Sequence, residues 1–293
     1  MREVTVLGLG SMGATLARLL LQRGRRVTVW NRTPAKGEAL AREGARVADS
    51  PAAAIQAGQL TVMCVYDYRA ASEILEQAGV AQAVRGRILV QLTTGSPQEA
   101  LEAAAWADAR GARYLDGAIQ AAPSQMGQPD TPLLLSGAET TYREALPVLS
   151  ELAGNIVYLG EQVDAASTMD LATLSYVYGA FLGFVHGARL AETSRLDVAQ
   201  YGRIVRSISP SFGAFFEHEG GVIQSGDFRI TESPMRISVE ATARILEASR
   251  AAGLATEIPA LAASLLDRAD QAGYGDEEVA AVIKVLRESP AAR

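Results

Sequence analysis

The chain of 293 residues is 48% hydrophobic, which is enough for a packed core in one large or two modest domains. Its net charge of −6 gives no basic surface for nucleic acid or for an acidic membrane, so neither is an expected partner. The single cysteine, Cys64, excludes an internal disulfide and fits a cytoplasmic protein, and two histidines cannot supply an ordinary zinc site, so no metal is expected.

The first motif is a glycine-rich turn between a strand and a helix. A β-branched run at 4–7 is followed by GLGSMG and then by residues 14–24, whose leucines recur at helical spacing. Glycines at this spacing permit a tight turn, close approach of a pyrophosphate and close helix–strand packing, and the helix N-terminus offers free N–H groups. The context predicts a dinucleotide site built from Gly8, Leu9, Gly10, Ser11, Met12 and Gly13.

The end of the second predicted strand, 26–30, indicates which dinucleotide binds. An NAD site usually carries an acidic residue there for the ribose 2′-hydroxyl, and this chain has Asn31, Arg32 and Thr33 instead, with Lys36 one turn further on. These donors and positive charges suit a 2′-phosphate and favour NADP(H). The alternative is that Arg32 and Lys36 are solvated surface cations.

Strands and helices continue to alternate up to Gly160. We expect strands at 60–65, 88–92, 114–115, 133–135 and 156–159, and helices at 70–78, 97–110 and 140–152. This pattern predicts an α/β fold: an N-terminal Rossmann domain, residues 1–161, with a doubly wound parallel sheet. Ligands of such sheets bind at the carboxyl ends of the strands, which adds Cys64, Val65, Thr93 and Thr94 to the predicted cofactor site.

The second half is predicted to be all-helical, with a long interdomain helix at 162–192 and a helical domain at 193–293. Breaks are expected near Gly220, Gly226 and Pro234. The interdomain helix is apolar on every side and therefore has to be covered all round, for which a second subunit is the economical cover. We expect a homodimer that shares this helix. A membrane span is the alternative, disfavoured by the tyrosines, histidine and glycines that interrupt the apolar run.

Asp170 stands at the entrance of that apolar helix. Burying a carboxylate costs several kcal/mol, about 2–7 even for a neutral polar group, unless it is paired or takes up a proton. The sequence MDLATLSYVYG offers no adjacent cation to pair with it. A functional role for Asp170 is therefore the first hypothesis for this helix.

A family resemblance adds to these inferences. The segments GLGSMG, VTVWNRTPAK, LTTGSP, YLDGAI, MDLATLSYVYG, FVHG, GLATEIP and DRADQAGYG together resemble the NADP-dependent imine reductases, relatives of the β-hydroxyacid dehydrogenases. The resemblance extends over nearly the whole chain. It implies a Rossmann domain, a helical domain exchanged between two subunits, and an active site in the cleft between them.

The departures from the dehydrogenase pattern concern the substrate. Those enzymes carry a lysine near the start of the interdomain helix and an asparagine one turn later. By the resemblance, the corresponding residues in this chain are Asp170 and Leu174. Their Ser-Gly-Gly loop for a substrate carboxylate corresponds to Gln120-Ala121-Ala122. A less polar substrate is therefore favoured. Hydride adds readily to a protonated C=N bond, and a carboxylate can stabilise the iminium or deliver the proton.

The resemblance implies further substrate contacts. Tyr178 matches a family tyrosine near the substrate and lies about 80° round an ideal helix from Asp170; an ordinary core tyrosine is the equal alternative. Ser238 from the other subunit, Gln120 and Met126 complete the predicted substrate-binding set. The expected function is NADPH-dependent reduction of imines, often cyclic, to amines. Alternatives are a β-hydroxyacid dehydrogenase or aldehyde reductase, and a non-catalytic NADPH-sensing dimer.

Overall fold

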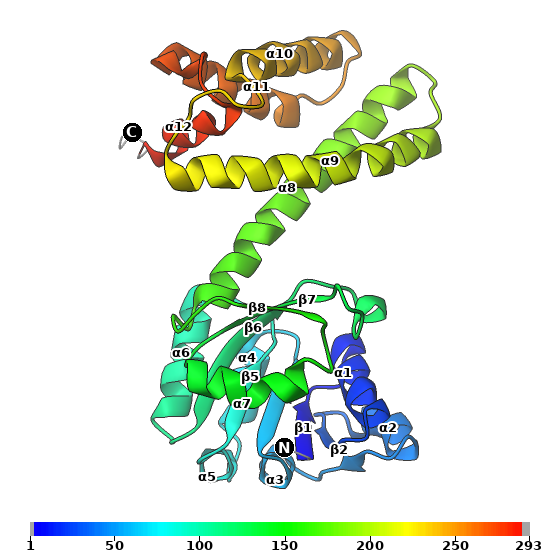
Figure 1. The fold of residues 1–293 in the computed structure, drawn as a ribbon. Coiled ribbons are helices and arrows are strands. Elements are labelled where there is room, and N and C mark those ends of the chain that lie inside the picture. Colours follow the sequence, from blue (N-terminus) through cyan, green and yellow to red (C-terminus); the bar gives the residue numbers. More distant parts are fainter. Residues whose placement is uncertain (1–2, 289–293) are drawn as a thin grey trace. The chain divides into compact units, whose positions relative to one another are not determined.

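The computed structural model describes residues 3–288 and divides the chain into two compact units (Figure 1). The first unit extends to Ser175 and the second begins at Tyr176. The boundary falls inside the longest helix, α8 (Ala165–Thr193). The expected fold class, a Rossmann domain followed by a long helix and further helices, is confirmed.

The first unit is built on one eight-stranded sheet with the order β3-β2-β1-β4-β5-β6-β7-β8. Its strands are β1 (Glu3–Leu7), β2 (Arg26–Trp30), β3 (Arg46–Val47), β4 (Leu60–Met63), β5 (Ile88–Gln91), β6 (Arg113–Ile119), β7 (Pro132–Ser136) and β8 (Asn155–Tyr158). Every neighbouring pair is parallel except β6 and β7, which run antiparallel with Asp116 opposite Ser136. The expectation of a wholly parallel sheet is corrected at this pair.

Helices cover both faces of this sheet. They are α1 (Ser11–Gln22), α2 (Glu38–Arg42), α3 (Pro51–Ala57), α4 (Tyr68–Leu75), α5 (Val80–Ala83), α6 (Pro97–Asp108) and α7 (Glu139–Leu149), with short turns η1 (Pro34–Gly37) and η2 (Pro123–Gln125). Buried side chains of α1, α2 and α7 pack on one face, and those of α3 to α6 pack on the other. Alternate residues of each strand supply the two cores, as the period of a strand requires.

Most helices of the first unit that follow a strand begin at a side-chain cap. Ser50, Asp67 and Ser96 each accept a hydrogen bond from the backbone of the first turn, and Ser96 with Glu99 forms a capping box. Helices α1 and α7 lack such a cap, and in α1 the N-cap is Gly10 and no side chain accepts from its first turn. Its free N–H groups are left for another partner.

The second unit is helical throughout its described part. After α8 come α9 (Val198–Ser225), α10 (Met235–Ala251), α11 (Glu257–Ala269) and α12 (Ile283–Arg287), with the π-helical turn η3 (Asp270–Tyr274) and the 3-10 turn η4 (Val279–Val282). The break expected near Gly220 is wrong, since α9 continues through it and ends at Gly226, whose φ of 71° forms a left-handed C-cap. Pro234 directly precedes α10, as expected.

Apolar side chains remain exposed along α8 and α9. Tyr176, Phe181 and Leu182 on α8 are more than half exposed, and Ile204, Phe212 and Phe216 on α9 are 46–52% exposed. By length and composition, α8, with mean hydropathy 1.2, is the one helix in the described range that could cross a membrane. A covered helix of a water-soluble assembly has the same composition, so this property alone does not decide between the two.

Candidate active site

One pocket of about 460 Å³ lies at the glycine-rich turn of the first unit. Its lining includes every predicted cofactor residue except Thr93 and Thr94, namely Gly8, Leu9, Gly10, Ser11, Met12, Gly13, Asn31, Arg32, Thr33, Lys36, Cys64 and Val65. The pocket lies at the carboxyl ends of β1, β2 and β4, where a doubly wound sheet binds its ligand.

The three glycines of the turn have different surroundings. Gly8 has φ +95°, and a Cβ there would lie 2.2 Å from the Cys64 carbonyl oxygen. A Cβ on Gly13 would lie 2.1 Å from the Gly8 carbonyl oxygen. Gly10 has an ordinary φ of −69° and no atom within 4 Å of its Cβ position, so neither strain nor packing within the chain requires a glycine there. A pyrophosphate that approaches the uncapped end of α1 would need a residue without a side chain at position 10, which explains the glycine.

The side chains after β2 form the other wall of this pocket. The Leu9 N–H donates to Asn31 Oδ1 at 3.0 Å, and Asn31 Nδ2 donates to the Thr33 carbonyl at 3.1 Å, so Asn31 ties the two loops together. Arg32 is 83% exposed and 3.7 Å from Glu73. A weak, solvated ion pair leaves the guanidinium free to turn toward an anion. Arg32 and Lys36 share one pocket wall, as expected for 2′-phosphate ligands.

Thr93 and Cys64 have structural surroundings. Thr93 is buried, and its hydroxyl accepts a hydrogen bond from the Val65 N–H at 3.0 Å, so it joins the ends of β4 and β5 and does not line the pocket. Thr94 is exposed and also lies outside the pocket lining. Burial raises the pKa of the Cys64 thiol to about 11, which makes it a packing residue and a poor nucleophile.

The start of α8 is fixed to the sheet by two buried side chains. Ser136 Oγ on β7 accepts from the Ala166 N–H at 3.0 Å, and Asp116 Oδ2 on β6 accepts from the Ser167 N–H at 3.0 Å. Asp116 Oδ1 also accepts from the Tyr68 hydroxyl at 2.7 Å. Burial raises the pKa of Asp116 to about 6 despite these donors. The LDGAI motif thus positions the helix that carries Asp170.

Asp170 lies one turn further along α8 and is only 4% exposed. Its Oδ1 accepts a hydrogen bond of 2.5 Å from Gln120 Nε2, which follows β6. Gln120 Oε1 in turn accepts from the Thr173 hydroxyl at 2.8 Å. Burial raises the pKa of Asp170, and the Gln120 hydrogen bond lowers it in part. Asp170 is therefore a desolvated carboxyl group with a single side-chain partner among the described residues, a state common for acid–base groups.

Comparison with known proteins places these features in a family. Residues 3–160 match the model of the NAD binding domain of 6-phosphogluconate dehydrogenase, and residues 162–288 match that of the NADPH-dependent reductive aminase-like C-terminal domain. An imine reductase from Myxococcus stipitatus, solved in complex with NADP+, is 30% identical with a TM-score of 0.90, covering 97% of this chain and 100% of that one. The chain belongs to the imine reductase family.

Two further proteins that are similar to this chain are reductive aminases. The enzyme from Aspergillus terreus, solved with NADPH4, cyclohexanone and allyl amine, is 32% identical with a TM-score of 0.87, covering 98% of this chain and 99% of that one. The NADPH-dependent reductive aminase from Aspergillus oryzae is 28% identical over 98% of this chain and 97% of its own length. The resemblance inferred from the sequence motifs is confirmed.

The remaining predicted substrate residues differ in their burial and in the unit to which they belong. Met126 is 4% exposed and belongs to a buried core cluster of the first unit, and its substrate role stays a prediction. Gln120 contacts Asp170 directly. Tyr178 is 63% exposed, and Ser238 is half-buried on α10; both lie in the second unit, and their substrate roles stay predictions. His186 Nε2 lies 3.0 Å from Ser249 Oγ, consistent with a structural histidine.

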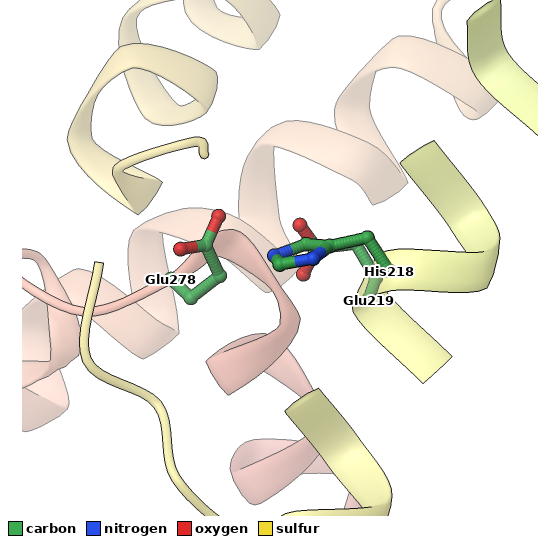
Figure 2. A group of neighbouring side chains, drawn as sticks. All are labelled: His218, Glu219 and Glu278. Carbon is green, nitrogen blue, oxygen red and sulfur yellow. The ribbon is translucent and has the colours of Figure 1, made fainter. Parts of the chain in front are cut away.

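The second unit contains a histidine–carboxylate cluster that no sequence motif indicates. Figure 2 shows His218 and Glu219 of α9 beside Glu278, which precedes η4; one ligand-type atom of each lies within 4.8 Å of the others. Glu278 accepts hydrogen bonds from the backbone N–H groups of the 231–233 segment, and His218 Nε2 lies 2.9 Å from the Thr231 hydroxyl. These donors already satisfy the oxygens of the Glu278 carboxylate, so its hydrogen bonding does not require a cation.

The third member of this cluster, Glu219, is only partly hydrogen-bonded. Its Oε2 accepts from the Ala280 N–H at 3.1 Å, and its Oε1 is buried with no partner in the described part of the chain. Burial and the neighbouring Glu278 carboxylate raise the pKa of Glu219. A raised pKa favours the neutral form of Glu219, which lessens the repulsion between the two carboxyl groups.

Proposed function

We propose that this chain is an NADPH-dependent imine reductase that reduces the C=N bond of an imine, favourably a cyclic one, to an amine, with Asp170 as the group that protonates or stabilises the substrate nitrogen. The observation that carries this proposal is a carboxyl group only 4% exposed that no cation neutralises among the described residues. A cationic iminium is the complement that such a site lacks.

The residues that line the cofactor pocket belong to the first unit. When bound, NADPH supplies the hydride that is added to the carbon of the C=N bond. The open side of Gly10 and the uncapped N-terminus of α1 would hold its pyrophosphate, and Arg32, Thr33 and Lys36 would bind its 2′-phosphate. Relatives solved with NADP+ or NADPH4 support the same cofactor here.

Asp170 can serve in either protonation state because its pKa is raised by burial. In the protonated form it donates a proton to the imine nitrogen; in the ionised form it stabilises an iminium that is already protonated. A lysine at this position would repel that cation. Leu174 one turn along offers no amide for a hydroxyl substrate, which speaks against a β-hydroxyacid dehydrogenase.

Kinetics with two substrate classes test this function. Asp170→Ala should lower turnover of a five- or six-membered cyclic imine at least about tenfold, because the nitrogen loses its acid or counter-charge, while NADPH affinity changes little. Unchanged turnover would remove Asp170 from the mechanism. Oxidation of a hydroxy acid with NADP+ by the wild-type protein would favour the dehydrogenase, and tight NADPH binding without consumption on any imine would favour the sensor.

We infer further that the protein is a homodimer in the cytoplasm. The exposed apolar side chains of α8 and α9 need a cover, and a second copy presents the same surface in the isologous contact that two-fold symmetry provides. Light scattering on protein purified without detergent should give the mass of two chains. A monomer, or recovery only in the membrane fraction, contradicts this inference and returns α8 to the membrane alternative.

A further inference from the structure

The Thr173 hydroxyl beside Asp170 has two possible hydrogen-bond acceptors but only one proton. The Thr173 hydroxyl lies 2.8 Å from Gln120 Oε1 and 2.9 Å from the backbone carbonyl oxygen of Asp170. A hydroxyl group has one proton, so it can donate to only one of these oxygens at a time. The two arrangements differ in what they require of the Gln120 amide.

In the first arrangement Asp170 is ionised. Gln120 Nε2 donates to Asp170 Oδ1, and the Thr173 hydroxyl donates to Gln120 Oε1. Each group then has its partner, and the carboxylate has a charge-assisted hydrogen bond.

In the second arrangement Asp170 is protonated and the amide of Gln120 is rotated by half a turn. The Asp170 O–H then donates to Gln120 Oε1, Gln120 Nε2 donates to Thr173 Oγ, and the Thr173 hydroxyl donates to the Asp170 carbonyl, already at 2.9 Å. The terminal torsion of glutamine is broad and roughly two-fold, and the amide oxygen and nitrogen occupy nearly the same volume, so this rotation needs no repacking.

We propose that Gln120 is a positioning residue that holds Asp170 in place in both of its protonation states by rotating its amide. The Thr173 hydroxyl hydrogen-bonds to the amide atom of Gln120 that does not contact Asp170. This inference rests on the proposed function, which requires Asp170 to gain and lose a proton. In the reactive step the Asp170 O–H bond breaks and an N–H bond forms on the substrate; a proton from solvent then restores the acid. Gln120 therefore serves the acid and does not bind substrate.

The surroundings of Asp170 support this role. Burial and the Gln120 hydrogen bond are the two causes that shift its pKa, and no charged side chain contributes within residues 3–288. On the neighbouring strand, Asp116 is turned to Tyr68 and Ser167. With no ion pair to orient Asp170, the amide is its only side-chain partner among those residues. A glutamine can both donate and accept, which a lysine or an apolar residue at position 120 could not.

Gln120→Met tests the proposal, with Gln98→Met as the matched control. Gln98 also donates to a carboxylate, Glu102, at 2.9 Å, but on the exposed face of α6. We expect Gln120→Met to lower kcat at least about tenfold with KM for the imine within about threefold, and to raise the pKa of Asp170, because the ionised form loses the stronger hydrogen bond. The control should leave all three unchanged.

The pKa of Asp170 is measured independently of activity, by carbon NMR of 13C-labelled aspartate with Asp170→Asn to assign the signal. A rise of at least about half a unit in Gln120→Met supports the proposal. A raised KM with kcat and the titration unchanged would overturn it, because Gln120 would then bind substrate as the sequence predicted. If the titration shifts while Asp170→Asn keeps full turnover, Gln120 positions Asp170 but the proposed acid is wrong.

Gln120→Glu is the second variant, which separates positioning from loss of fold. Two adjacent carboxyl groups share one proton and titrate as a coupled pair. We expect the pH profile of kcat/KM to move to higher pH, while NADPH affinity and thermal stability stay close to those of the wild-type protein. A profile identical to that of the wild-type protein would overturn the proposal.

Discussion

The two units differ in how completely each encloses its own apolar side chains. In the first unit, large residues on both faces of the sheet, such as Leu16, Leu133 and Ile55, are at most 1% exposed. In the second unit, the buried cluster consists of Val222, Phe228, Met235, Ala269, Ala280, Ala281 and Val285, and bulkier residues of α8 and α9 stay exposed.

This difference separates the functions of a single chain from those that require the exposed apolar side chains of α8 and α9 to be covered. The dinucleotide pocket, the anchoring of α8 and the Asp170–Gln120 contact all lie within the first unit. Most of the exposed large apolar side chains of α8 and α9 lie in the second unit, although Met169 and Leu171 at the start of α8 belong to the first. Cofactor binding should therefore be a property of a single chain, and imine reduction a property of the covered form.

A charge on the exposed apolar surface of α8 should have the largest effect. Phe181 is 59% exposed, and Phe181→Glu places two unpaired carboxylates in the proposed symmetric interface, each costing several kcal/mol, about 2 or more. We expect the dissociation constant of the dimer to rise at least about 100-fold, measured by analytical ultracentrifugation. Imine reduction should fall in proportion to the dimer lost.

The matched control for this variant is Leu101→Glu. Leu101 is 44% exposed on α6 of the first unit, where the sheet is already covered. It should change neither mass nor activity. The monomer made by Phe181→Glu should still bind NADPH, and loss of that binding would contradict the assignment of the cofactor site to the first unit.

Leucine truncations in the two units should differ in how they depend on protein concentration. Leu133 is fully buried, so Leu133→Ala should cost about 2–5 kcal/mol of the free energy of unfolding at every concentration. Leu182 is 52% exposed in the single chain, so Leu182→Ala should destabilise only through association, with no effect where both proteins are monomers and a growing effect as concentration rises. Urea unfolding at two concentrations a hundredfold apart distinguishes them; identical behaviour of both variants would end the comparison.

Asp116 should make the stability of the first unit depend on pH. Its folded pKa of about 6 lies above the ordinary 3.8, so the folded state holds the proton more tightly than the unfolded state. The stabilisation is complete below the unfolded value and is lost as pH rises toward 6, by about 3 kcal/mol in total. Asp116→Asn should abolish this slope in urea unfolding between pH 4 and 7, whereas Asp108→Asn on the surface of α6 should keep it.

The first unit could be predicted closely from the sequence because its signals are local. β-branched runs, glycine spacing and the capping box each act within a few residues. The direction of β7 was not predicted although a signal is present: 120–131 contains Pro123, Gly127 and Pro129, which disfavour the helix that usually makes a parallel crossover. Strand β3 has two residues, too few for a pattern.

The surroundings of the site could be predicted only in part. The GLGSMG and NRT segments are local motifs, and their residues line one pocket. The partner of Asp170 is fifty positions away in sequence, and the Gln120 contact exists only because β6 ends beside the start of α8. The burial of Met126 could not be predicted for the same reason, since no local pattern distinguishes a methionine in a core from one that faces a ligand.

The smallest expected effect concerns cofactor choice within the first unit. Arg32→Ala should weaken NADPH about tenfold and NADH hardly at all, because an exposed guanidinium contributes mainly through the 2′-phosphate that NADH lacks. Arg42→Ala, an exposed arginine of α2 outside the pocket lining, is the control for the loss of one positive charge. Fluorescence titration of both dinucleotides gives the ratio. Since the pocket is complete in one chain, the same ratio should be found in the Phe181→Glu background; a ratio that depends on association would mean that the second copy reaches the cofactor.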